Sequence, residues 1–264
     1  MKKLRATARR IRELQATEID TMFALFTKYY ENVSRSQFIA DLNKKDHVFL
    51  LKDTHSFDIK GFSTLVSLSA QVNGRCVRAF FSGDTVVDRE YWGQGTLGVA
   101  FLFFLFLHKL RHPFQPLYWF LISKGYKTYL LMANNFAVHY PRYEKPTPPE
   151  MQALIDTFST HLYGQHYQTE RGVISFTASQ DSVKDTLRQH ITPITPELLK
   201  NPRIAFFQAR NPGWVQGDEL ACIARMTLSM PFYYQFKHIW KRLARTAGRS
   251  TAAQKPPSKG VQQC

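Results

Sequence analysis

Apolar residues recur at helical spacing in two stretches near the start of the chain. The first stretch follows Thr17-Glu18-Ile19-Asp20, a near capping box with an acid at its third helical position. In the second, Ser36 is placed to cap a short helix that runs to Leu42. The pattern therefore predicts two consecutive helices. The apolar and aromatic residues of the first are Met22, Phe23, Phe26, Tyr29 and Tyr30.

The pattern then changes to that of strands. Residues 47–52 (HVFLLK) predict a strand, and Asp53–Asp58 is expected to form the turn after it. Residues 61–72 are rich in β-forming side chains, and Asn73-Gly74 is a strong signal for a two-residue hairpin. Residues 75–88 are therefore expected to return antiparallel to residues 61–72.

A glycine-rich turn follows this hairpin. Gly93, Gly95 and Gly98 stand in the spacing G-x-G-x-x-G, after a predicted strand and before an apolar stretch. This stretch predicts a helix that ends at about Arg111, and the run LYWFLIS over 117–123 predicts a buried strand.

The second half of the chain shows a similar alternation of elements. A helix is expected from Lys124 to about His139, and the prolines of 146–149 mark a boundary. The spacing of apolar residues predicts a helix over 150–162. Residues 172–178 and 203–209 are expected to be strands.

Composition indicates one large folded domain with an extension. The chain has 264 residues, of which 44% are hydrophobic and 14% aromatic. Its three cysteines lie far apart with no metal-binding spacing, so no metal is expected and a reducing compartment is favoured. The longest apolar run, 97–107, is too short to span a membrane, and no signal peptide is visible. A cytoplasmic protein, in part peripheral at the membrane, is expected.

The positive charge is concentrated at the two ends of the chain. The net charge is +15, and twelve of these charges lie in residues 1–13 and 231–264. We expect a basic arm over 1–16, the main domain over 17–230, an amphipathic helix over 231–246 and a disordered tail over 247–264. The basic ends of the chain suit binding to an acidic carrier protein or to an anionic membrane surface. The amphipathic helix over 231–246 is expected either to lie at a membrane interface or to dock on its own domain. No nucleic-acid motif accompanies the charge, so nucleic acid is not expected as a partner.

The glycine turn predicts binding of a phosphate group. Glycines let the backbone N–H groups at a helix N-terminus approach phosphate oxygens closely. The candidate ligands are a dinucleotide and the pyrophosphate of coenzyme A. A dinucleotide site needs a carboxylate about 20 residues further on, and no Asp or Glu occurs between Glu90 and Glu144. A dinucleotide is therefore disfavoured.

The order of elements and the stretch from Val87 to Gly98 resemble the GNAT acyltransferase superfamily. Its signature is a valine strand end that leads into (Gln/Arg)-x-x-Gly-x-(Gly/Ala), where this chain has Glu90 at the first position, with Arg89 one residue early. The resemblance covers roughly residues 18–140. It implies an α/β fold, with a mixed, largely antiparallel central sheet flanked by helices, and a C-terminal extension. The residues it assigns to the donor are Val87, Gly93, Gln94, Gly95, Thr96, Leu97 and Gly98.

The resemblance also implies a base and an acid for acyl transfer. Candidate bases are Asp84, Asp88 and Glu90, and Asp84 is preferred because apolar neighbours predict its burial and a raised pKa. The alternative is that Asp84 satisfies a turn beside a glycine. For the acid, Tyr126 and Tyr129 lie in the helix after the buried strand, where core packing is the alternative.

The expected reaction moves an acyl group from a CoA or acyl-carrier-protein thioester to an amine or hydroxyl acceptor. The alternative is a non-catalytic acyl-CoA-binding or membrane-surface module with the same fold. Four phenylalanines in the helix after the turn form core or line an acyl channel, and a channel predicts tighter binding of a medium or long acyl chain than of acetyl-CoA. These residues are Phe101, Phe103, Phe104 and Phe106.

Overall fold

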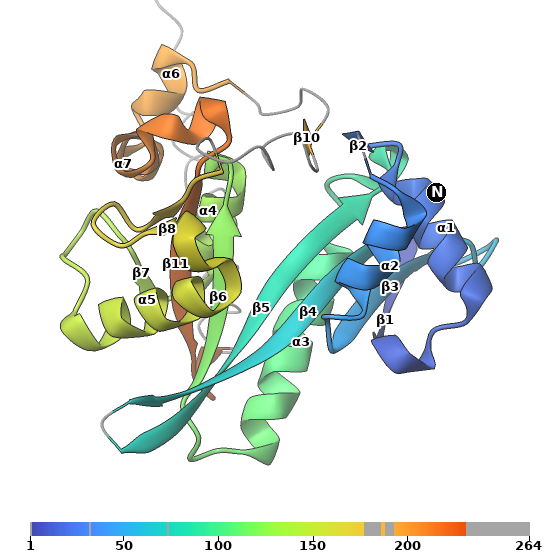
Figure 1. Cartoon of the computed structure of the whole chain (residues 1–264), viewed down its shortest axis with the longest axis horizontal. Coiled ribbons are helices and arrows are strands. Elements are labelled where there is room, and N and C mark those ends of the chain that lie inside the picture. Colours follow the sequence, from blue (N-terminus) through green and yellow to red (C-terminus); the bar gives the residue numbers. More distant parts are fainter. Residues whose placement is uncertain (1, 32, 73, 177–185, 188–192, 231–264) are drawn as a thin grey trace, which may run out of the picture. The chain divides into compact units, whose positions relative to one another are not determined.

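The computed structural model describes residues 2–31, 33–72, 74–176, 186–187 and 193–230 (Figure 1). The chain divides into two compact units, Met1–Leu228 and Ser229–Cys264. All of the elements discussed below belong to the first unit. The helix expected over 231–246 and the tail expected over 247–264 lie outside the described residues.

The described residues of the first unit form a nine-stranded mixed sheet. Neighbouring strands pair antiparallel throughout, except that β5 and β6 are parallel. The expected α/β fold with a largely antiparallel central sheet is thereby confirmed. In spatial order the strands are β1 (Leu4–Arg10), β3 (His47–Asp53), β4 (Ile59–Val72), β5 (Arg75–Val87), β6 (Leu117–Ser123), β11 (Glu219–Met226), β9 (Val173–Ile174) and β8 (Tyr167–Gln168), and β7 (His139–Tyr140) also pairs with β11. A separate pair joins β2 (Tyr30–Glu31) to β10 (Thr186–Leu187).

Helices cover both faces of the sheet. The helices are α1 (Ala16–Phe26), α2 (Arg35–Leu42), α3 (Thr96–Arg111), α4 (Tyr126–Asn135), α5 (Pro149–Tyr163), α6 (Pro196–Leu199) and α7 (Pro202–Arg210). Phe62 of β4 packs in the core cluster under α1 and α2, and Leu68 packs in the cluster under α5. Leu68 lies six positions after Phe62 on the same strand, and an even offset places both side chains on the same face of the sheet.

The helix α3 covers the opposite face. The ring of Phe101 on α3 contacts the rings of Phe49 and Trp119, and Phe49 alternates along β3 with Val48 and Leu50, which face α1 and α2. Figure 1 shows α3 crossing behind β4 and β5. The β-strands thus lie between two helical layers, which is a consequence of alternate apolar residues on both faces.

The two parallel strands separate partway along their length. They pair only where Arg78–Phe81 lies beside Leu117–Phe120, and the remaining residues of both, all described, do not pair with each other. On the other edge of β5, Ser63 pairs with Thr85 but Leu65 pairs with Ser82, so β5 carries one extra residue around Gly83 and Asp84. Such a β-bulge bends the strand that contains it. We refer to the opening between the unpaired ends of β5 and β6 as the split.

The hairpin and the turn agree with the sequence, but the caps of the first two helices differ from it. The helix α1 is capped by Gln15 and Glu18, two residues before the predicted box. The helix α2 is capped by Ser34, whose hydroxyl accepts a hydrogen bond from the Gln37 amide, and not by Ser36. The prediction placed each cap two residues late. Ser34 and Ser36 are equally good caps by residue type, and Gln15 is not a residue that cap preferences favour.

Two segments were assigned to the wrong class. Residues 4–10, expected within a basic arm, form β1 and pair along their whole length with β3, because an otherwise free sheet edge offers them backbone partners. Residues 203–209, expected as a strand, lie in α7, where Asn201 caps the helix and Pro202 occupies its first turn. The strand at this side of the sheet is β11 instead. The helix α4 also ends at Asn135, before the predicted His139.

Candidate functional site

The glycine turn joins the end of β5 to the N-terminus of α3. Gly93 has φ of 81° and Gly95 has φ of 71°, a left-handed conformation that favours glycine. A Cβ added at Gly93, Gly95 or Gly98 would have no atom within 4 Å, so packing does not require these glycines. The backbone geometry requires the first two, and open space lies in front of all three. The N–H groups of the first turn of α3 have no partner within the helix, so they are available to an anion.

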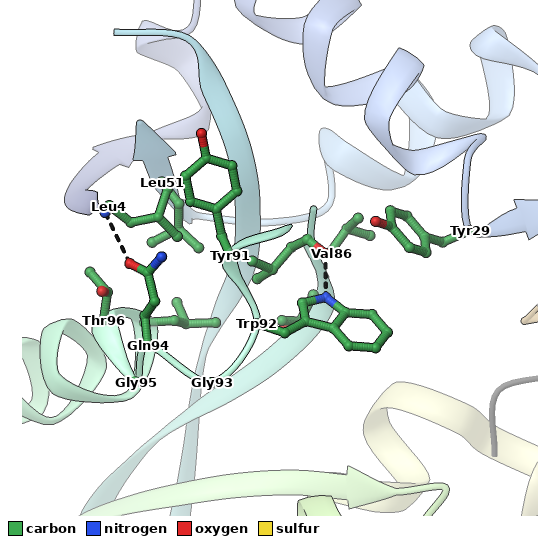
Figure 2. A pocket seen from close by; sticks show the side chains of 13 residues that line it. Leu4, Tyr29, Leu51, Val86, Tyr91, Trp92, Gly93, Gln94, Gly95 and Thr96 are labelled. Atoms are coloured by element: carbon green, nitrogen blue, oxygen red, sulfur yellow. Dashed lines mark hydrogen bonds between the residues drawn. The ribbon is translucent and has the colours of Figure 1, made fainter. Parts of the chain in front are cut away.

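A cavity of about 360 Å³ opens at this turn (Figure 2). The described residues that line the cavity include no charged side chain. An anion in the cavity would therefore meet no carboxylate that repels it and no lysine or arginine that attracts it. Of the predicted donor residues, all except Gly98 line the cavity. The lining comprises Leu4, Tyr29, Leu51, Thr85, Val86, Val87, Tyr91, Trp92, Gly93, Gln94, Gly95, Thr96 and Leu97.

Side chains hold the turn against the body of the sheet. The Tyr91 hydroxyl donates to Asp53 Oδ2 at 2.8 Å, which raises the pKa of Tyr91 to about 12. Trp92 Nε1 donates to the Val87 carbonyl at 2.7 Å. These two hydrogen bonds fasten the turn to β3 and to the end of β5, so that its backbone is ordered before any ligand binds.

The first residues of the chain also fasten the turn. Figure 2 shows Gln94 beside Leu4, whose amide donates to Gln94 Oε1 at 3.1 Å, and Gln94 Nε2 donates in turn to the Lys2 carbonyl at 3.2 Å. Lys2 forms an ion pair with Glu90. At the signature position, where the GNAT pattern has Gln or Arg, this chain has Glu90, and the charge of Glu90 is paired with that of Lys2. Glu90, a candidate base, is 63% exposed and engaged in this pair.

Asp84, the preferred base, lies in the bulge of β5 beside the split. Its side chain is 41% exposed, so the predicted burial is wrong: Asp84 lies in the bulge, where its carboxylate reaches solvent. Lys45 Nζ lies 4.0 Å from Asp84 Oδ2 and 5.9 Å from the centre of the Phe81 ring. Asp88, the third candidate, lies 3.6 Å from Lys28 Nζ, away from the split.

The opposite side of the split carries a second carboxylate, on β11. Glu219 is 15% exposed, and its carboxylate lies 3.6 Å from Lys124 Nζ. Burial raises the pKa of Glu219, the charge of Lys124 opposes this, and the charge of Asp84 adds to it. Sequence reasoning missed Glu219 because it missed β11, although the continuous apolar run over 220–224 is typical of a buried strand.

A tyrosine from α5 completes this group of side chains. The ring of Tyr163 lies 6.2 Å from that of Phe81. Burial raises the pKa of Tyr163 well above its ordinary value, with further contributions from the charges of Glu219 and Asp84. We call Lys45, Asp84, Lys124, Tyr163 and Glu219 the split cluster. The structure therefore brings together residues from five segments, of which the sequence identified only Asp84.

The two tyrosines predicted as acids have different surroundings. Tyr129 is fully buried, its hydroxyl donates to the Pro141 carbonyl at 3.1 Å, and burial raises its pKa far above the ordinary value. This hydroxyl is committed to the core, which favours the packing alternative. Tyr126 is buried at the start of α4, directly after β6, and its role as an acid stays a prediction.

The phenylalanines of α3 do not share one environment. Phe104 contacts Phe49 and Phe80, and Phe101 packs on the same face, whereas Phe103 is 60% exposed. Phe101 and Phe104 are therefore part of the core between α3 and the sheet. Among the described residues, no group of three metal-ligating side chains comes together. Within that same part of the chain, no helix is long and apolar enough to cross a membrane.

No protein-family model matches the chain, and no curated protein matches it. Solved structures similar to it include a GNAT-family N-acetyltransferase from Escherichia coli in complex with CoA, with 18% identity over 46% of this chain and 64% of that one, and a TM-score of 0.32. Another is an acetyltransferase from Trypanosoma brucei, with 19% identity over 55% and 98%, and a TM-score of 0.37. The chain spans 33% of a probable N-acyltransferase from Enterococcus faecalis, at 12% identity over 53% of this chain and a TM-score of 0.37. The assignment of a GNAT-like fold rests on the strand order, the split and the glycine turn.

Proposed function

We propose that this GNAT-like chain transfers an acyl group from a CoA thioester to an amine or hydroxyl acceptor. The observation that carries the proposal is the glycine turn at the N-terminus of α3, which opens into an uncharged cavity next to the split. Backbone amides at a helix N-terminus bind phosphate oxygens through hydrogen bonds and through the helix dipole. The pyrophosphate of CoA is the group that this turn would hold.

The split supplies a path for the rest of the donor. The backbone groups of β5 beyond Phe81 have no partner on β6, so the pantetheine amides can pair with them as an extra strand would. The thioester would then lie between β5 and β6, where the carboxylates of the split cluster are found. An acyl carrier protein also carries a pantetheine arm, so it is the pyrophosphate at the glycine turn that favours a CoA donor.

Acyl transfer also needs proton transfers at the split. Asp84 faces this opening, which keeps it a candidate base, and Tyr126 at the start of α4 is the candidate acid for the leaving thiolate. The proposal does not specify the length of the acyl chain. Phe101 and Phe104 pack on the sheet, so they do not support a channel for a long acyl chain.

The experiment that tests the proposal measures thiol release. Purified full-length protein is mixed with acetyl-, octanoyl- or palmitoyl-CoA and with a panel of amines and alcohols, and the products are identified by mass spectrometry. Release of CoA together with an acylated acceptor supports the proposal. Binding of CoA without turnover across the panel supports the non-catalytic module. Absence of CoA binding contradicts both.

A further inference from the structure

The split cluster contains two carboxylates that are near enough for the charge of Asp84 to act on Glu219. Asp84 stands on the β5 side, paired with Lys45, and Glu219 stands on the β11 side, paired with Lys124. Ala221 and Ile223 lie two and four residues after Glu219 on β11, so the three side chains point to the same face of the sheet. Ala221 and Ile223 pack in the core under α5 together with Phe81. Glu219 therefore lies on the face of the sheet that α5 covers, the face on which Lys45 and Tyr163 contact Phe81.

An unpartnered hydroxyl marks the same place independently. Thr64 is 1% exposed, and its Oγ1 has no hydrogen-bond partner among the described residues. A Cβ built on Gly83 would lie 2.7 Å from Thr64 Oγ1 and 3.3 Å from Lys45 Nζ. The bulge thus brings a cation and a buried hydroxyl without a described partner next to Asp84, where a water or a bound group can complete the hydrogen bonding of the hydroxyl.

On the basis of the proposed acyl transfer, we infer that Glu219 accepts the proton of a primary amine that enters the split between Asp84 and Glu219. Asp84 attracts the ammonium form of the acceptor, and Glu219 takes its first proton. The pairing of each carboxylate with a lysine keeps both side chains directed at the opening. Lys124 and Lys45 are thus positioning residues.

The surroundings of the two carboxylates suit them to different tasks. The Asp84 side chain is 41% exposed and lies next to Lys45. Burial raises the pKa of Glu219 toward the pH at which a general base is effective, and the nearby charge of Asp84 raises it further. Tyr163 faces both from α5 and remains protonated, because burial and the two carboxylates raise its pKa.

The step balances as follows. The ammonium gives one proton to the Glu219 carboxylate, and the freed lone pair forms the C–N bond with the thioester carbonyl carbon. The C–S bond then breaks, and the nitrogen loses its second proton, which ends on the departing thiolate. The products are an amide, free CoA and a protonated Glu219, which returns its proton to water.

The first test needs no acceptor. The carboxyl carbons of 13C-labelled glutamate are titrated by NMR in the full-length protein, with Glu219 assigned through its backbone connectivity. We expect the pKa of Glu219 in the wild type to lie above the ordinary 4.5. Asp84→Asn should lower this pKa because it removes a like charge, and Lys124→Gln should raise it because it removes a cation. A pKa at or below the ordinary value overturns the inference.

The second test measures turnover with acetyl-CoA and whichever of benzylamine, spermidine or glycine the wild type acylates fastest. Glu219→Gln should lower kcat by about 100-fold or more with unchanged affinity for CoA. Activity should return in part above pH 9, where the acceptor is already deprotonated. Glu219→Asp, which keeps a carboxylate, should lose less than about 10-fold, and Asp84→Asn should move the acidic limb of the pH profile to lower pH.

The outcomes separate this inference from the proposed function. No turnover by the wild type with any acceptor defeats the proposed function and, with it, the inference. Turnover by the wild type that Glu219→Gln retains, with the same acidic limb, leaves acyl transfer intact and overturns the role of Glu219. Equal losses in Glu219→Gln and Glu219→Asp without a change in the pH profile show a structural role only, which also overturns it.

Discussion

The glycine turn and the split cluster are built in opposite ways. The turn is a contiguous stretch whose backbone conformation creates the site, and the side chains that line its cavity carry no charge among the described residues. The split cluster consists of charged and phenolic side chains from five segments, and the bulge in β5 and the packing of α5 bring them together. The turn therefore depends on local conformation, and the cluster depends on tertiary packing.

This difference predicts different sensitivities to mutation. Changes in the core under α5 should alter the cluster and leave the turn unaffected. Changes in the backbone of the turn should weaken donor binding and leave the cluster unaffected. The following experiments test this separation.

The largest effect is expected for Phe158→Ala. Phe158 is fully buried on α5, and its ring lies 5.8 Å from that of Phe120. Its truncation leaves a cavity between α5 and the sheet and should lower the free energy of unfolding by about 3–5 kcal/mol, measured by urea denaturation. Phe103→Ala is the control, since Phe103 is exposed, and should change it by less than about 0.5 kcal/mol. Equal effects would show that α5 does not form part of the core.

Acid should destabilise the side of the sheet that carries β11. Burial, together with the nearby Arg142 and Arg203, lowers the pKa of His139 to about 4, against the opposing effects of the Phe136 carbonyl and Glu144. The unfolded chain takes up this proton near pH 6.5, so the free energy of unfolding falls as the pH drops from 6.5 toward 4. The contribution of His139 to this loss should reach about 2 kcal/mol at pH 5.

Urea denaturation at pH 7 and pH 5 measures this loss. His139→Gln keeps a side-chain N–H for the Phe136 carbonyl, removes the titrating group and should show a smaller decrease. His108, whose pKa burial also lowers to about 4, accounts for part of the remainder. If the free energy of unfolding of His139→Gln falls between pH 7 and pH 5 by as much as that of the wild type, His139 is not a source of the acid sensitivity.

A third experiment strains the turn without touching the cluster. Gly95→Ala forces a Cβ into the left-handed conformation and should cost about 1–2 kcal/mol in stability or displace the backbone amides. We expect at least a tenfold loss of affinity for CoA by calorimetry. Gly74→Ala is the matched control, because Gly74 has φ of 72° and open space around it in the β4–β5 hairpin. Equal CoA affinities of the two variants would show that the turn is not the donor site.

The smallest effect is expected where the first residues of the chain meet the turn. Gln94→Ala removes both hydrogen bonds to the backbone of Lys2 and Leu4 and should lower the affinity for CoA about two- to fivefold, equivalent to less than about 1 kcal/mol. Lys2→Gln removes only an exposed ion pair and should have less effect. A larger effect of Lys2→Gln than of Gln94→Ala would indicate that Lys2 contacts the donor directly.

The contrast also explains what the sequence could and could not predict. The hairpin at Asn73-Gly74, the glycine turn and the buried strand over 117–123 follow from local patterns, and the structure confirms them. The strand β1 was missed because its residues read as a basic tail, and only the free edge of β3 gives their backbone a partner.

The members of the split cluster could not be found in the same way. Glu219 and Tyr163 lie 135 and 79 residues after Asp84, in segments without a recognisable motif. Their proximity depends on β11 pairing with β6 and on α5 packing under both. Burial of Asp84 was predicted wrongly because apolar neighbours in sequence do not reveal that the residue lies in a bulge, where its side chain stays partly exposed.

The most direct test compares CoA with pantetheine, which lacks the pyrophosphate together with the adenosine 3'-phosphate, in calorimetric titrations of the wild type and of Gly95→Ala, where the variant isolates the contribution of the turn. If the turn holds the pyrophosphate, the wild type binds CoA at least tenfold more tightly than pantetheine, and Gly95→Ala loses this difference while its affinity for pantetheine stays the same. Equal binding of CoA and pantetheine by the wild type would contradict the assignment of the glycine turn as the donor site.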